Sequence, residues 1–194
     1  MTPPKNHFGA ILIDPPWPFA TWSARGRNRS ADNHYPLMTL EDIAALDVGQ
    51  FARDDCALFV WVTWPSLPQA LMVIEAWRFK YKTCAFCWTK ADASQIDMLR
   101  DDLTPAMGLG YWTRSNSEVC LLATRGKPKR LQADVRQAII EPAREHSRKP
   151  RIHQRIERLV TGPYLEMFAR QLQAGWSVLG NEVGKFTSDM EAAE

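Results

Sequence analysis

Residues 8–17 of the chain read FGAILIDPPW, and this stretch decides the fold class. Its first six residues, 8–13, are apolar apart from one glycine, which is typical of a strand buried on both faces of a parallel sheet. An aspartate, two prolines and a tryptophan then end the strand abruptly. In open α/β sheets ligands bind beyond the carboxyl ends of the strands, so Asp14 stands where a functional residue is expected.

The rest of the chain alternates apolar runs with segments of helical periodicity. Further strands are predicted at 57–62, 84–89, 119–124, 164–169 and 176–183. Helices are predicted from a capping box at Thr39, after Ser66, and over 150–160. This alternation predicts an α/β fold with a doubly wound, mostly parallel central sheet flanked by helices. We expect a single domain over residues 1–194, with its core at about 8–183 and a frayed tail at 185–194.

Length and composition exclude several classes of protein. The 194 residues, 45% of them hydrophobic, allow one substantial core. No export signal or apolar run of membrane-spanning length is visible, so we expect a cytoplasmic protein that does not contact a membrane. Cys84 and Cys87 fall on a predicted strand, where residues three apart point to opposite faces, and no second Cys or His pair lies at ligand spacing. We therefore predict ordinary buried cysteines and no metal site.

The charge is unevenly placed along the chain. The formal net charge is only +2, yet residues 125–158 hold 11 Lys and Arg against 4 Asp and Glu. A basic face on a nearly neutral protein is the feature expected of one that binds a phosphate-rich partner, although a solvated surface is the alternative. The charge pattern thus favours nucleic acid as the partner.

The turn Asp14-Pro15-Pro16-Trp17 has the groups needed to methylate the exocyclic amine of adenine. The lone pair of that amine is delocalised into the ring, so the nitrogen is a poor nucleophile. A carboxylate at Asp14 and a backbone carbonyl of Pro15 or Pro16 would both accept from the amino hydrogens and return electron density to the nitrogen. Such fixed dipoles need no reorganisation during the reaction. Trp17 is predicted to stack on an extruded base.

At this point the sequence resembles the MT-A70 family, relatives of the catalytic subunit of the mRNA adenosine N6-methyltransferase that include bacterial and phage members. The resemblance covers about residues 8–183 in the same order. It is carried by DPPW (14–17), HYPLMTLEDI (34–43), LFVWVT (58–63), GYWTRSNSEVCLLATRGKPKR (110–130), REHSRKP (144–150), IERLVTGPYLEMFAR (156–170) and GWSVLGNEV (175–183). It implies a Rossmann-like methyltransferase fold and S-adenosylmethionine as cofactor.

The resemblance also implies roles for individual residues. In the family's pattern Asp14 to Trp17 hold the target amine, and Tyr35 and Glu118 lie near the substrate base. The implied cofactor contacts are Asp14, Lys149 at the methionine carboxylate, Glu166 at a strand end, Arg170 on the ribose side, Gln173 in place of a His-Asn pair that follows this arginine in the mRNA enzyme, and Asn181 and Glu182 at the adenosine. Gln171 is the alternative to Gln173, because the segment after Arg170 is two residues shorter than in the mRNA enzyme.

Further candidates for substrate binding come from the residues themselves. Arg25, within the long polar segment 18–36, suits a phosphate contact on a mobile lid, and a plain flexible loop is the alternative. His34 would help this loop close over the base. For Trp88 and for Trp112, two roles are open: stacking on the base and packing in the core.

These observations lead to one predicted function and two alternatives. We expect an S-adenosylmethionine-dependent N6-methyltransferase that acts on adenine in DNA, with RNA adenosine as the alternative substrate. The other alternative is a catalytically silent nucleic-acid-binding partner subunit, which the intact motif argues against. Either a homodimer or a heterodimer is compatible with the sequence.

Overall fold

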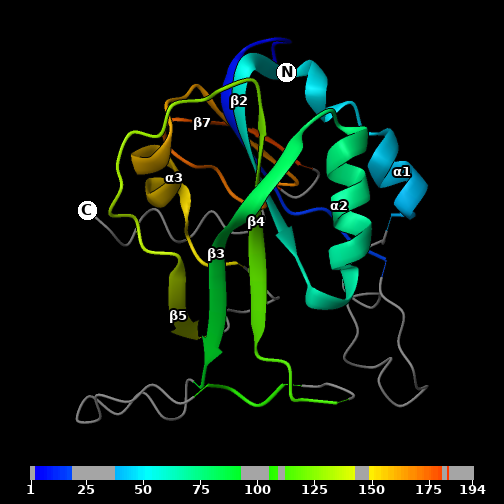
Figure 1. Cartoon of the computed structure of the whole chain (residues 1–194), viewed down its shortest axis with the longest axis vertical. Helices are drawn as coiled ribbons and strands as arrows, with labels where there is room; N and C mark the ends of the chain where they lie inside the picture. The colour runs from blue at the N-terminus through cyan, green and yellow to red at the C-terminus, as the bar shows by residue number, and fades with distance from the viewer. Residues whose placement is uncertain are drawn as a thin grey trace.

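The computed structural model describes residues 3–18, 38–92, 105–108, 112–142, 149–180 and 183. Within these ranges the strands form one seven-stranded sheet in the order β5-β3-β4-β2-β1-β6-β7 (Figure 1). The strands are β1 (Phe8–Ile13), β2 (Ala52–Val62), β3 (Lys80–Ala91), β4 (Ser117–Arg125), β5 (Ala138–Pro142), β6 (Tyr164–Met167) and β7 (Trp176–Leu179). The described helices are α1 (Leu40–Ala45), α2 (Leu67–Ala76) and α3 (His153–Leu159), with 3-10 turns η3 (Val48–Gln50) and η4 (Trp64–Ser66).

Strand β1 lies inside the sheet, and its six residues are all buried. It runs parallel to β2 on one side and to β6 on the other. The pairs β6·β7 and β3·β5 are also parallel, whereas β4 is antiparallel to both β2 and β3. The predicted α/β class with a mostly parallel sheet is therefore confirmed.

The helices cover the two faces of this sheet separately. Ile11 and Ile13 of β1 pack in the same cluster as Ile43 of α1 and Ile74 of α2. Leu12, which points to the opposite face, belongs to a second cluster that contains Ile156 of α3. Figure 1 shows the same division, with α1 and α2 on one side of the strands and α3 on the other.

The start of α1 is fixed by the predicted capping residue. The Thr39 hydroxyl accepts a hydrogen bond from the Asp42 amide at 3.1 Å and donates to the Asp42 carboxylate at 2.8 Å. This pairing satisfies one of the amides that a helix start leaves without a partner. None of the helices in the described segments is long and apolar enough to cross a membrane.

Several element boundaries differ from those predicted. β2 begins at Ala52 and β3 at Lys80, because polar, exposed residues extend both strands beyond their apolar parts. β5 was not predicted, since Ile139 is the one residue of this strand that is buried. β6 ends at Met167, two residues before the predicted end, and the next residue, Phe168, has a φ of 59°. β7 likewise ends at Leu179.

Cys84 and Cys87 do not point to opposite faces as expected. Both pack against the cluster on the α1 and α2 face. The pairing of β3 with β4 is irregular between Cys84 and Phe86, and such a bulge inserts a residue that reverses the alternation. Both cysteines are free, and no group of His, Cys, Asp and Glu among the described residues could hold a metal ion.

Candidate active site

The strand directions gather the predicted site residues at one edge of the sheet, which we call the carboxyl edge. The parallel strands β1, β2 and β6 end there, and Asp14 follows β1 directly. β4 runs the other way, so its beginning, with Glu118, lies at this edge. β3 is antiparallel to β4, so the end of β3, which includes Lys90, also lies at the carboxyl edge.

The turn after Asp14 is held by backbone and indole hydrogen bonds. The Trp17 amide donates to the Pro15 carbonyl at 2.8 Å, and the Met38 amide donates to the Pro16 carbonyl at 3.3 Å. The Trp17 indole N–H donates to the backbone carbonyl of Trp61 at 2.8 Å. The turn is thereby tied to the neighbouring strand β2.

Trp17 is only 7% exposed and belongs to the hydrophobic core. It therefore offers no free face to a base, contrary to the stacking role predicted for it. Its large apolar ring and its bond to Trp61 instead anchor the turn that carries Asp14. An aromatic residue after a polar turn looks exposed in sequence, but its burial is decided by distant strands.

Two lysines from separate segments lie beside the acids Glu118 and Asp14. Nζ of Lys149 lies 2.5 Å from one carboxylate oxygen of Glu118, and Nζ of Lys90 lies 2.6 Å from the other. Lys149 also lies 3.7 Å from a carboxylate oxygen of Asp14 and 5.9 Å from the ring centre of Trp61. Lys149 thus links the acid at the end of β1 to the acid at the start of β4.

This arrangement shifts the pKa values of the two acids in opposite directions. Burial raises the pKa of Asp14 above its ordinary 3.8, and Lys149 opposes that rise. Burial would also raise the pKa of Glu118, but Lys149 and Lys90 outweigh it and hold that pKa below 4.5. Glu118 is therefore firmly ionised at neutral pH, whereas Asp14 is the more easily protonated of the two.

A second polar pair lies beside this group. Nε2 of His153, the first residue of α3, is 2.8 Å from a carboxylate oxygen of Glu166 in β6. The His153 ring packs edge-on against Trp176 at 4.7 Å, and its Nδ1 is buried with no hydrogen-bond partner among the described residues. This contact fixes the orientation of Glu166 next to the carboxyl edge.

The sequence matches a known protein family over most of its length. The family model described as MT-A70 matches residues 8–182. The chain belongs to the MT-A70 family. It is accordingly an enzyme of the adenine N6-methyltransferase class, and the resemblance noted from its motifs is confirmed.

Relatives of this MT-A70 chain differ widely in length. It is 29% identical to the type II methyltransferase M.MunI of Mycoplasma sp, over 93% of the chain and 79% of that protein. It is 28% identical to an N(6)-adenosine-methyltransferase MT-A70-like protein of Arabidopsis thaliana, over 91% of the chain and 24% of that protein. It is 26% identical to the human N(6)-adenine-specific methyltransferase METTL4, over 94% of the chain and 39% of that protein. The chain thus spans only a quarter to two fifths of the two eukaryotic proteins.

The residues near Asp14 fit S-adenosylmethionine, the methyl donor of MT-A70 enzymes, in their chemistry. A small cavity of about 60 Å³ opens at the carboxyl edge. Its lining combines the cations Lys149 and Arg170 with the acids Asp14 and Glu166, so it offers partners for a carboxylate and for hydroxyl groups. Of the two glutamines considered, Gln171 lines this cavity and Gln173 does not. The remaining predicted cofactor residues, Asn181 and Glu182, lie outside the described residues.

The predicted substrate residues of the MT-A70 chain have different outcomes. Trp88 is 1% exposed and its indole donates to the Glu141 carbonyl at 3.0 Å, so it belongs to the core and cannot stack on a base. Trp112 is 92% exposed and can still do so. Arg25, His34 and Tyr35 lie outside the described residues.

Two residues of this site were missed from the sequence. In the sequence Lys90 has no feature that distinguishes it from a surface lysine at the end of a strand. Its contact with Glu118 depends on the antiparallel pairing of β3 with β4. His153 falls within the predicted helix and lacks any local signal for its bond to Glu166, which lies 13 residues further along. In both cases the partner is set by the tertiary fold.

The basic run at 125–158 does not form one face beside the site. Lys149 is at the carboxyl edge, whereas Arg125 ends β4 at the opposite edge of the sheet. Arg155 and Arg158 on α3 bond to the 132–138 segment through the Arg136 carbonyl and the Asp134 carboxylate. The antiparallel direction of β4 separates these charges, and the sequence pattern did not predict it.

Proposed function

We propose that the chain transfers a methyl group from S-adenosylmethionine to the N6 amine of adenine in DNA. The observation that carries the proposal is the position of Asp14, which stands at the carboxyl end of the buried strand β1 within reach of Lys149. A carboxylate placed there can accept a hydrogen bond from an adenine amine brought to this edge. The prolines after it limit how the turn can move.

Asp14 and a proline carbonyl act together in this mechanism. The Pro15 and Pro16 carbonyls each accept one backbone amide, and each oxygen keeps a second lone pair. Either can therefore accept one amino hydrogen while ionised Asp14 accepts the other. The two acceptors draw the nitrogen towards a tetrahedral geometry, which makes its lone pair available for attack.

The rest of the site positions the reactants and handles charge. When bound, S-adenosylmethionine would supply a methyl group on a positively charged sulfur, which the amine nitrogen would take as the C–S electron pair returns to sulfur. The surplus proton on nitrogen then leaves to Asp14 or to water. Lys149 suits the methionine carboxylate, because its ammonium is a cation with three N–H donors and lies beside Asp14 at the carboxyl edge. Glu166, oriented by His153, suits the ribose hydroxyls.

DNA is proposed over RNA because of how the chain compares with its relatives. It spans 79% of a type II methyltransferase, a class of DNA-modifying enzyme, but only 24% of the plant adenosine methyltransferase. The same sheet and turn could serve RNA, so the substrate must be tested directly. Nucleic acid of either kind is the partner that the exposed basic residues between 127 and 136 favour.

The test is transfer of labelled methyl groups to matched substrates. Purified protein should label the N6 position of adenine in duplex or single-stranded DNA more readily than in RNA of the same sequence. Asp14→Asn should remove transfer, and Asp47→Asn, an exposed aspartate in the turn before η3, should retain it. Faster labelling of RNA would reverse the choice of substrate, and no labelling of either would favour a silent subunit.

A further inference from the structure

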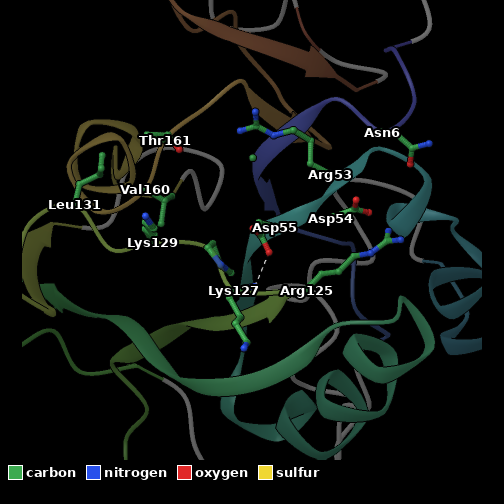
Figure 2. A pocket seen from close by; sticks show the side chains of 12 residues that line it. Asn6, Arg53, Asp54, Asp55, Arg125, Lys127, Lys129, Leu131, Val160 and Thr161 are labelled. Carbon is green, nitrogen blue, oxygen red and sulfur yellow. Dashed lines mark hydrogen bonds between the residues drawn. The ribbon is translucent and has the colours of Figure 1, made fainter.

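A larger cavity lies at the edge of the sheet opposite Asp14, which we call the amino edge. Its volume is about 860 Å³, within the range of ligand-binding clefts. Figure 2 shows its walls, formed by the starts of β1 and β2, the segment after β4 and the segment before β6. This amino-edge cavity is lined by Asn6, Gly9, Arg53, Asp54, Asp55, Arg125, Lys127, Pro128, Lys129, Leu131, Val160 and Thr161.

Cations outnumber acids in this lining. The lining holds two acids, Asp54 and Asp55, and four cations, Arg53, Arg125, Lys127 and Lys129. Within the described ranges no ion pair joins any of these cations to either acid. The Asp55 carboxylate instead accepts a hydrogen bond from the backbone amide of Lys127 at 2.7 Å, as Figure 2 shows. That bond orders the loop and leaves the lysine ammonium groups available. A cavity of this kind favours an anion.

The two arginines are held in place by backbone carbonyls. Arg53 donates to the Gly162 carbonyl at 2.5 Å, and Arg125 donates to the Gly49 carbonyl at 2.8 Å. A guanidinium has five N–H donors, so one such bond fixes its position while others remain for a ligand. Gly9 is required beside Arg53, because an added Cβ would lie 2.5 Å from the backbone carbonyl oxygen of Thr161. The site is therefore preformed.

The positive charge continues beyond the cavity along the chain. Between Arg125 and Arg136 there are five basic residues and one acid, and Lys127, Lys129, Arg130 and Arg136 are exposed. A single small anion would need only the cavity, whereas a row of charges suits a chain of phosphates. The continuous row of positive charge therefore favours a chain of phosphates over a single small anion.

We propose that the amino-edge cavity binds phosphate groups of the nucleic-acid backbone, at a distance from the adenine that is methylated. The inference rests on the proposed function, because it concerns a second contact with the same substrate. Glu118 and Arg125 mark the two edges on one strand, seven residues apart, or about 23 Å at about 3.3 Å per residue. A duplex advances about 3.4 Å per base pair, so the substrate must extend at least about seven base pairs beyond the target to reach the cavity.

The test compares duplexes of two lengths without cofactor, so that binding is measured separately from transfer. Lys127→Gln with Lys129→Gln should weaken binding of a duplex of about 30 base pairs roughly tenfold at low salt. The slope of log affinity against log salt should fall by about 1.8, since each lost phosphate contact contributes about 0.9. Binding of a duplex of about six base pairs should not change.

The matched control is Lys80→Gln with Lys82→Gln, which removes the same charge from exposed residues at the start of β3, outside the cavity lining. Its slope should stay within about 0.5 of the wild-type value. An unchanged slope for the Lys127 and Lys129 variant, an equal loss for both lengths, or no binding of the long duplex would each overturn the proposal. So would pyrophosphate binding that depends on these lysines when duplex binding does not, because the ligand would then be a free phosphate.

The two proposals fail separately. Absence of methyl transfer to DNA, with length-dependent binding intact, would reject the proposed function and leave the amino-edge contact standing. Normal transfer to DNA, with a salt slope that ignores Lys127 and Lys129, would reject the contact alone.

Discussion

The ammonium of Lys149 lies 2.5 Å from a carboxylate oxygen of Glu118, although the two residues are 31 positions apart in the chain. The same ammonium is 3.7 Å from Asp14, so a single cation is shared between two acids whose pKa values shift in opposite directions. Lys149 therefore affects both the ionisation of Asp14 and the stability of the carboxyl edge.

Asp14→Asn is expected to slow methyl transfer strongly and to stabilise the fold. An amide cannot replace the carboxylate as a charged acceptor, and loss of one such group typically slows the chemical step by about 10²- to 10³-fold. Burial raises the pKa of Asp14, so at neutral pH its ionised form opposes folding, and the neutral amide relieves that. Single-turnover transfer and thermal unfolding measure the two effects. A lower melting temperature would contradict the second.

The rate of methyl transfer should fall on the acid side at a higher pH than an exposed aspartate would give. In the proposed mechanism Asp14 accepts from the amine only when it is ionised, and its ionised fraction is lost as pH falls through a pKa that lies above 3.8. Lys149 lowers that pKa, so Lys149→Gln should move the acid limb further up in pH. Single-turnover pH–rate profiles at saturating cofactor test this. If Lys149→Gln does not move the acid limb, the group that titrates there is not Asp14.

Glu118→Gln should destabilise the protein by about 3 kcal/mol, since two lysines would lose their shared carboxylate in a poorly hydrated place. Because the pKa of Glu118 is lowered by folding, its contribution is present at neutral pH and is lost as pH falls through that pKa. Urea unfolding at pH 7 gives the free energy. Adding Lys90→Gln should restore part of the lost free energy of unfolding. The control Glu41→Gln, at an exposed residue, should change that free energy by less than about 0.5 kcal/mol.

His153→Phe should weaken cofactor binding while keeping the fold. The phenyl ring can still pack against Trp176, but it cannot hold Glu166, and one lost hydrogen bond to a charged group is expected to cost about tenfold in affinity. Calorimetric titration with S-adenosylhomocysteine measures the affinity, and the melting temperature controls for folding. Unchanged affinity with an unchanged melting temperature would show that Glu166 needs no such support.

The sequence predicted the parts of the fold that depend on local pattern. The continuous apolar run before Asp14 identified β1 and its carboxyl end, and Thr39 identified the start of α1. It did not predict that β4 runs antiparallel, because apolar periodicity carries no information on strand direction. That one direction brings Lys90 and Glu118 together and sends Arg125 to the other edge.

The motif and the family resemblance named several residues that the fold brings together, and the roles given to them stay predictions. Asp14, Glu118, Lys149 and Arg170 do converge, but their meeting could not be inferred from spacing, since they come from segments far apart in the chain. Trp17 and Trp88 show the opposite case. Both lie next to polar turns or strand ends, and both are buried in core clusters, where backbone carbonyls distant in the chain accept their indole hydrogens.

Strand β4 has a consequence for how such a chain can vary. Its nine residues connect Glu118, which meets Lys149, with Arg125, which meets Gly49. Deleting one residue from this strand would reverse the facing of every side chain on one side of the gap, so one of the two contacts would be lost. Insertions and deletions tolerated by natural homologues should therefore fall outside it, and the spacing between these two positions should be invariant.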